Sequence, residues 1–159
     1  METPEEFEGK AYVHYKSWQE TYRGQLSDDY LDQMSLEKCL AIARRWPERT
    51  LIAKVDGRVV GFSAYGPYRD DTLPNTGEVH ALYLLKEYQK QGIGYALMTA
   101  AIEKLRESAY DQAALWVLKG NQKAIPFYER FGFRFDGCEK SILIGSIVTE
   151  QRMLYPLGK

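Results

Sequence analysis

The sequence predicts a mixed α/β (α+β) fold, in which helices cover both faces of one sheet. Three observations predict it. Helical patterns fill residues 4–46, and the two-residue alternation of strands begins at residue 50. A strand, a glycine turn, a helix and a strand then follow one another over residues 78–118, which indicates a right-handed crossover between parallel strands. Two last strands, near 133–144 and 147–156, are expected to form a hairpin.

Three helices are expected before the first strand. The first covers residues 4–20 and carries acidic residues in its opening turns, where the helix dipole favours anions. Ser27 is placed to cap a short helix within 24–34, and Ser35 to cap a third helix over 35–46.

A hairpin follows the helices. Residues 50–55 and 58–66 read as strands, and Asp56 and Gly57 between them form a typical two-residue turn. The proline, aspartate and glycine content of residues 67–77 predicts a loop.

The central unit consists of a strand at 78–85, a helix at about 92–108 and a buried strand at 112–118. Spacings of three and four residues define an apolar stripe on this helix. Its members are Leu97, Met98, Ala101, Ile102 and Leu105.

Another helix is predicted over residues 121–132, with Asn121 as a possible cap and Gly132 as the C-terminal stop. Pro126 would then lie inside the helix, where it removes one backbone hydrogen bond and kinks the first turns.

Composition limits the class of protein. One domain over residues 1–159 is expected, with a formal net charge of −1 from 21 Lys+Arg and 22 Asp+Glu. That balance argues against nucleic-acid binding through bulk charge. No apolar stretch of about 18 residues predicts a membrane span. Cys39 and Cys138 have no metal-ligand spacing and form no disulfide scaffold, so no metal is expected and a reducing cytoplasm is the expected location.

The turn between strand 78–85 and its helix, Gln89–Ala96, reads QKQGIGYA and suggests a phosphate site. A dinucleotide fingerprint is one interpretation, but Leu97 replaces its third glycine and Asp111 precedes the next strand instead of following it. In the other interpretation, backbone N–H groups converge at the helix start, and the two glycines allow close approach. That arrangement suits a pyrophosphate without a metal.

Gln89–Gly94 also matches the Q/R-x-x-G-x-G/A acyl-CoA motif, and the sequence here resembles the GNAT N-acetyltransferase superfamily. The surrounding segment 77–98 is similar to the core strand, loop and helix of that superfamily. Residues 121–133 resemble its second motif, and residues 14–31 its opening helices. Two departures stand out. Family members usually begin with a strand before the first helix, and the basic residue common at the first motif position is Gln89 here.

The resemblance implies transfer of the acetyl group of acetyl-CoA to a primary amine, by direct attack in a ternary complex. The implied partner is a small-molecule or protein amine, with no nucleic acid or membrane involved; homodimers are common in the family. The residues implied to hold the cofactor are Leu82, Tyr83 and Leu84 on the strand, Gln89, Lys90, Gln91, Gly92, Ile93, Gly94, Tyr95 and Ala96 in the turn, and Asn121. For Tyr83 simple packing is the alternative, and for Asn121 a helix cap.

Three residues carry the implied chemistry. Tyr128 matches the family tyrosine that acts as general acid on the leaving thiolate, although it could be a core aromatic. Glu78 is the first candidate for the base that deprotonates the amine, and His80, two residues on along the same strand face, is the second. Water is a third possibility for this role.

An acceptor pocket is expected under residues 14–34 and 66–77. The rings and carboxylates there would suit a cationic amine, although ordinary exposed charges are the favoured interpretation. The residues concerned are Trp18, Tyr22, Asp28, Asp29, Asp32, Tyr68, Asp70 and Asp71. An alternative to the enzyme remains open, namely a CoA-binding sensor or interaction module without turnover.

Overall fold

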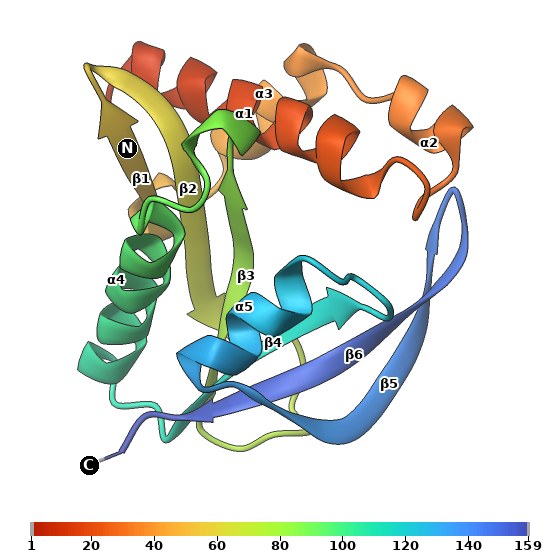
Figure 1. The fold of residues 1–159 in the computed structure, drawn as a ribbon. Coiled ribbons are helices and arrows are strands. Elements are labelled where there is room, and N and C mark those ends of the chain that lie inside the picture. Colours follow the sequence, from red (N-terminus) through yellow and green to blue (C-terminus); the bar gives the residue numbers. More distant parts are fainter. Residues whose placement is uncertain (1, 159) are drawn as a thin grey trace.

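The computed structural model describes residues 2–158 and confirms the predicted fold class (Figure 1). The helices are α1 (Pro4–Tyr22), α2 (Asp28–Asp32), α3 (Leu36–Ala43), α4 (Ile93–Glu107) and α5 (Ala124–Phe131). The strands are β1 (Thr50–Val55), β2 (Arg58–Pro67), β3 (Thr76–Leu84), β4 (Gln112–Leu118), β5 (Arg134–Ile144) and β6 (Ser146–Pro156). Two short 3-10 turns, η1 (Pro47–Arg49) and η2 (Lys86–Tyr88), precede β1 and α4.

The six strands form one sheet in the order β1-β2-β3-β4-β6-β5. Every neighbouring pair is antiparallel except β3 and β4, which are parallel and are joined through α4. This is the predicted central crossover, with the predicted hairpins β1–β2 and β5–β6 at the two edges. β3 begins at Thr76, which pairs with Gln112 of β4, so the strand starts two residues earlier than the sequence indicated.

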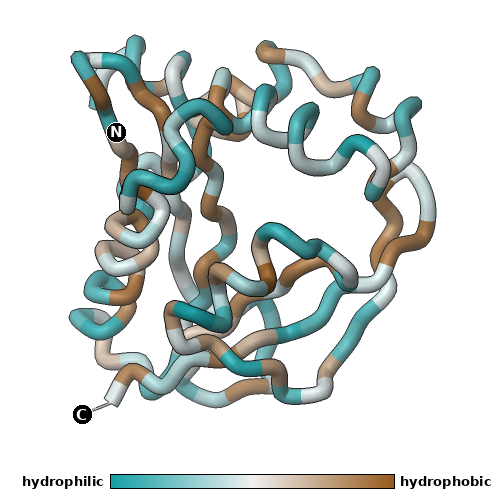
Figure 2. Tube along the Cα trace, viewed as in Figure 1, coloured by the Kyte–Doolittle hydropathy of each residue, from teal (hydrophilic) through white to brown (hydrophobic). Residues whose placement is uncertain are grey.

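Successive side chains of β2 point to opposite faces of the sheet, and their contacts show which helix covers which face. Val60 and Phe62 pack with Val13 of α1. Ser63 points the other way, and its hydroxyl donates a hydrogen bond of 3.2 Å to the backbone oxygen of Leu97 in α4. Helices α1 and α3 therefore cover one face, and α4 the other. Figure 2 shows hydrophobic and hydrophilic residues alternating along α4, as expected for a helix with one buried side.

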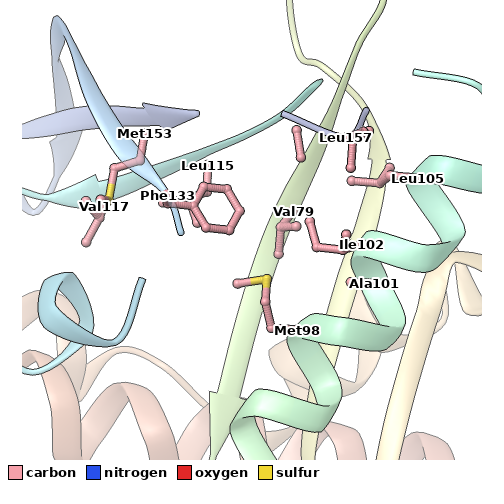
Figure 3. Packing of buried hydrophobic residues seen from close by; sticks show 11 residues of the cluster. Val79, Met98, Ala101, Ile102, Leu105, Leu115, Val117, Phe133, Met153 and Leu157 are labelled. Atoms are coloured by element: carbon pink, nitrogen blue, oxygen red, sulfur yellow. The ribbon is translucent and has the colours of Figure 1, made fainter. Parts of the chain in front are cut away.

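The larger core lies on the α4 face. All five residues of the predicted α4 stripe are buried. Figure 3 shows Met98, Ala101, Ile102 and Leu105 directed toward Val79 of β3, and Leu115, Val117, Phe133 and Met153 grouped beside them. Partly buried apolar residues of α5 pack against the same cluster, so α5 shares the face of α4.

The predicted start of α5 was wrong by three residues. The helix begins at Ala124, and Asn121 lies in the turn before it. The Asn121 side chain accepts a hydrogen bond of 3.2 Å from the Ala124 N–H, so it still closes the approach to the helix. Pro126 consequently sits in the first helical turn, where its missing N–H costs no helical bond and the expected kink has no cause.

None of the helices within residues 2–158 combines the length and the apolar character that crossing a membrane would require. The same residues contain no gathering of three or more His, Cys, Asp or Glu side chains able to hold a metal ion.

Gly9 gives a test of the packing between α1 and β2. A Cβ added at Gly9 would lie 2.7 Å from both Cβ and Cγ2 of Val59, a β-branched side chain with little freedom to move. We expect Gly9→Ala to lower the free energy of unfolding by about 1–3 kcal/mol through overpacking, although alanine is the better helix former. Denaturant unfolding measures the change.

Gly94→Ala is the matched control, because it also replaces a helical glycine but the added Cβ lies at an ordinary 3.7 Å from Phe127. It should leave stability unchanged or raise it by up to about 1 kcal/mol. Equal effects of the two substitutions would contradict the close packing at Gly9.

Candidate functional site

The sheet opens along the boundary between β3 and β4. Their ladder has three residue pairs, Thr76 with Gln112, Gly77 with Ala113, and Glu78 with Ala114. Beyond these pairs the two strands diverge, as Figure 1 shows. The later residues of β3 keep their partners in β2, while their other edge faces the opening.

A cavity of about 260 Å³ occupies this opening. Val79 to Tyr83 of β3 and Leu115 to Leu118 of β4 form its two sides. Asn121, Ala124 and Tyr128 line it from the α5 region, while Trp18, Tyr22, Arg69, Ile142, Ile144 and Glu150 line it from other segments. The cavity thus brings together residues from most of the chain.

The glycine turn lies next to the end of β3. Lys90 and Gly92 have positive φ angles of 64° and 87°, and Gly92 caps α4. The first helical hydrogen bond runs from the Ala96 N–H to the Gly92 oxygen at 3.0 Å. The N–H groups of Ile93, Gly94 and Tyr95 therefore precede the hydrogen-bond ladder of α4, at the positive end of its dipole. A phosphate group bound at this turn, as the sequence analysis expects, would meet these N–H groups.

The side chains of Gln89 and Gln91 in the turn form hydrogen bonds with the backbone just before it. The side chain of Gln89 donates to the Leu84 oxygen at 3.3 Å, and that of Gln91 donates to the Glu87 oxygen at 3.4 Å. Both side chains thus bind backbone within their own segment. Tyr95 is exposed, with its ring against Phe131 at 5.1 Å between centroids.

Tyr128 packs between aromatic rings and also faces the cavity. Its ring meets those of Phe127 and Phe133 edge-on, at 5.7 and 6.2 Å between centroids. Burial, and to a lesser degree the hydroxyl of Tyr22, raise the pKa of Tyr128 far above the usual 10. The hydroxyl therefore remains a proton donor at every physiological pH.

Two further tyrosine hydroxyls meet in the cavity. Tyr22 of α1 and Tyr83 of β3 lie 3.3 Å apart, hydroxyl to hydroxyl, and their segments are 61 residues apart in the chain. Burial raises the pKa of Tyr83 to about 12 and that of Tyr22 well above its usual value. Tyr83 also stacks on His14, with an angle of 11° between the rings. The Tyr83 ring packs against His14 while its hydroxyl lies in the cavity. Packing, the alternative interpretation of Tyr83, therefore does not conflict with a contact to the cofactor.

Glu78 is fully buried and closely held. Its carboxylate accepts hydrogen bonds from Arg69, at 2.7 Å from Nε and 3.2 Å from the backbone N–H. His80 Nδ1 lies 3.2 Å from the same carboxylate, which confirms that Glu78 and His80 share a strand face. His80 and Arg69 line the cavity, whereas Glu78 lies behind them.

The remaining predicted cofactor residues divide into two groups. Leu82 and Asn121 line the cavity beside Tyr83 and Tyr128. Leu84 packs in the smaller core around Phe62, away from the cavity. Asn121 and Tyr128 face the same space although only Tyr128 belongs to the helix.

On the acceptor side, Trp18 and Tyr22 line the cavity as predicted. The carboxylates predicted with them do not: Asp28 and Asp32 are exposed and pair with Arg23, at 3.2 and 2.7 Å. Asp29, Asp70 and Asp71 are also exposed. Tyr68 is buried, and its hydroxyl accepts a hydrogen bond from Arg152 at 3.1 Å. The favoured interpretation, ordinary surface charges, describes these aspartates.

Among the polar and aromatic residues of the cavity, sequence reasoning missed Arg69, Trp116 and Glu150. Glu150 lies on β6, and its side chain is only 14% exposed. Burial raises its pKa, while Lys140 and Arg69 act in the opposite direction. Gln151 and Arg152 follow Glu150 in the same strand, so no local pattern in the sequence marks this glutamate as buried.

A family model described as the acetyltransferase (GNAT) family matches residues 12–133. An uncharacterized N-acetyltransferase of Bacillus subtilis, YuaI, is 33% identical over 132 residues, which cover 80% of this chain and 74% of that protein. A probable N-acetyltransferase of Mycobacterium tuberculosis is 30% identical over 141 residues, which cover 84% of this chain and 78% of that protein.

A similar solved structure is that of a PaiA N-acetyltransferase from Thermoplasma acidophilum in complex with coenzyme A. It has a TM-score of 0.71 and 26% sequence identity, and the match covers 95% of this chain and 94% of that chain. The chain belongs to the GNAT family of acetyltransferases.

Proposed function

We propose that this protein transfers the acetyl group of acetyl-CoA to a primary amine, by direct attack in a ternary complex. The observation that supports it most is the opening between β3 and β4, which Tyr128 lines and which lies along the strand that leads into the glycine turn. Residues 1–159 act in this proposal as a single acyl-CoA-binding domain.

The turn offers what a CoA pyrophosphate requires. The N–H groups at the start of α4 would receive it, with Lys90 adding a positive charge. Space is available, because a Cβ added at Gly92 would meet no atom within 4 Å and one at Gly94 only Phe127. The free edge of β3 at Leu82–Leu84 would pair with the pantetheine arm, and Asn121 would contact it from the opposite side.

The reaction forms a carbon–nitrogen bond and breaks the carbon–sulfur bond of the thioester. The Leu82 N–H would stabilise the negative charge that develops on the acetyl oxygen. Tyr128 would donate its proton to the departing sulfur. Cys39 is buried in α3 and Cys138 lies on β5, so neither is placed to carry the acetyl group.

The acceptor ammonium must lose a proton before attack, because only the neutral amine is nucleophilic. The Glu78–His80 pair would take this proton. His80 lines the cavity and Glu78 does not, so His80, or a water beside it, makes the first contact and Glu78 holds the imidazole through Nδ1. Arg69 neutralises the buried carboxylate in turn.

Ligand binding tests the cofactor. CoA at 100 times its dissociation constant should stabilise the protein by about 2.7 kcal/mol, seen as a rise in melting temperature, whereas NAD should give no rise. Gly94→Val should abolish the CoA effect, because a branched side chain would stand where the pyrophosphate approaches. Gly94→Ala is the control and should retain most of it. Stabilisation by NAD alone would refute the cofactor assignment.

Steady-state kinetics tests Tyr128. Tyr128→Phe keeps the ring and removes only the donor, so kcat should fall by about one to three powers of ten while KM for acetyl-CoA changes little. Tyr155→Phe is the control, since Tyr155 packs on Phe131 and Phe133 outside the cavity and should keep full activity. An unchanged kcat in Tyr128→Phe would make Tyr128 a packing residue only.

A pH series tests the proton acceptor. His80→Gln and Glu78→Gln should each lower kcat/KM at neutral pH, by about a hundredfold for loss of a general base. The deficit should shrink as pH rises, because more of the amine is then neutral without assistance. Wild-type rates in both variants would assign the proton to water.

CoA binding by a wild-type protein that acetylates none of a broad amine panel would indicate a binding module instead of an enzyme.

A further inference from the structure

The ammonium group of one lysine of the protein contacts two residues that line the cavity. Lys140 Nζ lies 3.9 Å from Glu150 Oε1 and 4.1 Å from the centre of the Trp116 ring. Glu150 and Trp116 both line the cavity. A carboxylate beside an indole face is a favourable site for an alkylammonium group, because charge attraction and the ring quadrupole act together.

The carboxylate has capacity left for another donor. Oε1 of Glu150 is buried and accepts no hydrogen bond, since the Lys140 contact is too long for one. A buried acceptor without a donor is costly. The carboxylate of Glu150, a residue that lines the cavity, is therefore incompletely satisfied.

A ligand ammonium could displace the Lys140 side chain from its contacts with Glu150 and Trp116. It lies on β5, the outermost strand of the sheet, and its side chain is 32% exposed. A lysine side chain has a long flexible stem and can turn into solvent at little cost. A ligand ammonium that entered the cavity would replace one alkylammonium by another.

The site lies away from the proposed thioester position. Glu150 and Lys140 face each other across β5 and β6, and Glu150 is level with Leu118 of β4. Leu118 packs on the α1–α2 face with Leu26 and Leu31. Tyr128 enters instead from α5, on the α4 face. The cavity therefore joins two faces of the sheet, with Glu150 toward one and Tyr128 toward the other.

We propose that Glu150 and Trp116 bind a second cationic group of the acceptor, and that the acceptor is an alkylamine carrying a further ammonium besides the reacting one. This inference rests on the proposed function. The reacting nitrogen must be neutral, whereas a buried carboxylate favours the charged form of its partner. Glu150 thus suits the ammonium that does not react, and it sets specificity while His80 and Glu78 serve the reacting nitrogen.

Kinetics with 1,4-diaminobutane and n-butylamine tests the inference, because the two amines differ only in the second ammonium. The quantity measured is the ratio of their kcat/KM values. Wild type should favour the diamine by about tenfold or more, and Glu150→Gln should remove that preference. Lys140→Met, which keeps the stem and removes the competing charge, should lower KM for the diamine. Melting curves confirm that both variants are folded.

Calorimetric titration of 1,4-diaminobutane into wild type and Glu150→Gln, both with CoA present, separates this inference from the proposed function. Diamine binding that Glu150→Gln weakens supports the site even if no amine is acetylated. Two results overturn it: equal diamine binding by the two proteins, or a diamine-to-monoamine ratio that Glu150→Gln leaves unchanged while both rates fall. The second result would make Glu150 a general base.

Discussion

The functional architecture depends on how few hydrogen-bonded pairs join β3 to β4. Three pairs hold the strands together at one end, where Gly77 lies close against Leu105 and Tyr110 of the α4 segment. A side chain at Gly77 would collide with both, so the small residue permits the tight end of the sheet. Beyond Glu78 each strand pairs only with its outer neighbour. The cavity, the free edge of β3 and the route between the two faces all follow from this divergence.

In the proposed reaction, the CoA phosphates, the leaving sulfur and the cationic acceptor would each interact with a different kind of protein group. The backbone dipoles at the start of α4 would attract the CoA pyrophosphate, whose charge is spread over several oxygens. No charged side chain is needed to form these dipoles. Burial keeps the hydroxyls of Tyr22, Tyr83 and Tyr128 protonated. Carboxylates serve cations, but Glu78 is saturated by Arg69 and His80, while Glu150 has a lone pair to spare. That difference in saturation is the reason for proposing different roles for the two glutamates.

Two parts of the site, the glycine turn and the helix α4 that follows it, could be predicted because they depend on short stretches of sequence. The turn at Gly92 needs a positive φ, and the α4 stripe needs a helical period, so both were visible in the sequence. Glu150 was not visible, because its burial depends on the pairing of β6 with two other strands and on Trp116, 34 positions earlier. Asp28 and Asp32 were near the site in sequence, yet the short helix α2 turns them toward Arg23 and solvent. The start of α5 was misplaced because Asn121 bonds the Ala124 N–H from within a turn, where the sequence suggested a cap.

The tip of the β5–β6 hairpin touches α2, and Gly145 makes this contact possible. Its φ is 75°, and a Cβ there would fall 2.3 Å from the Ser27 hydroxyl and 2.6 Å from Tyr30 Cβ. In the proposed function, the acceptor would meet the N-terminal helices and the last hairpin together with His80 and Trp116 of the sheet, while the turn and α5 would meet CoA. On this proposal, substitutions confined to α1, α2 or the last hairpin would alter which amine is accepted without disturbing CoA binding. The proposal thus predicts an evolutionary modularity, in which the donor site would be retained while the range of acceptors diverges.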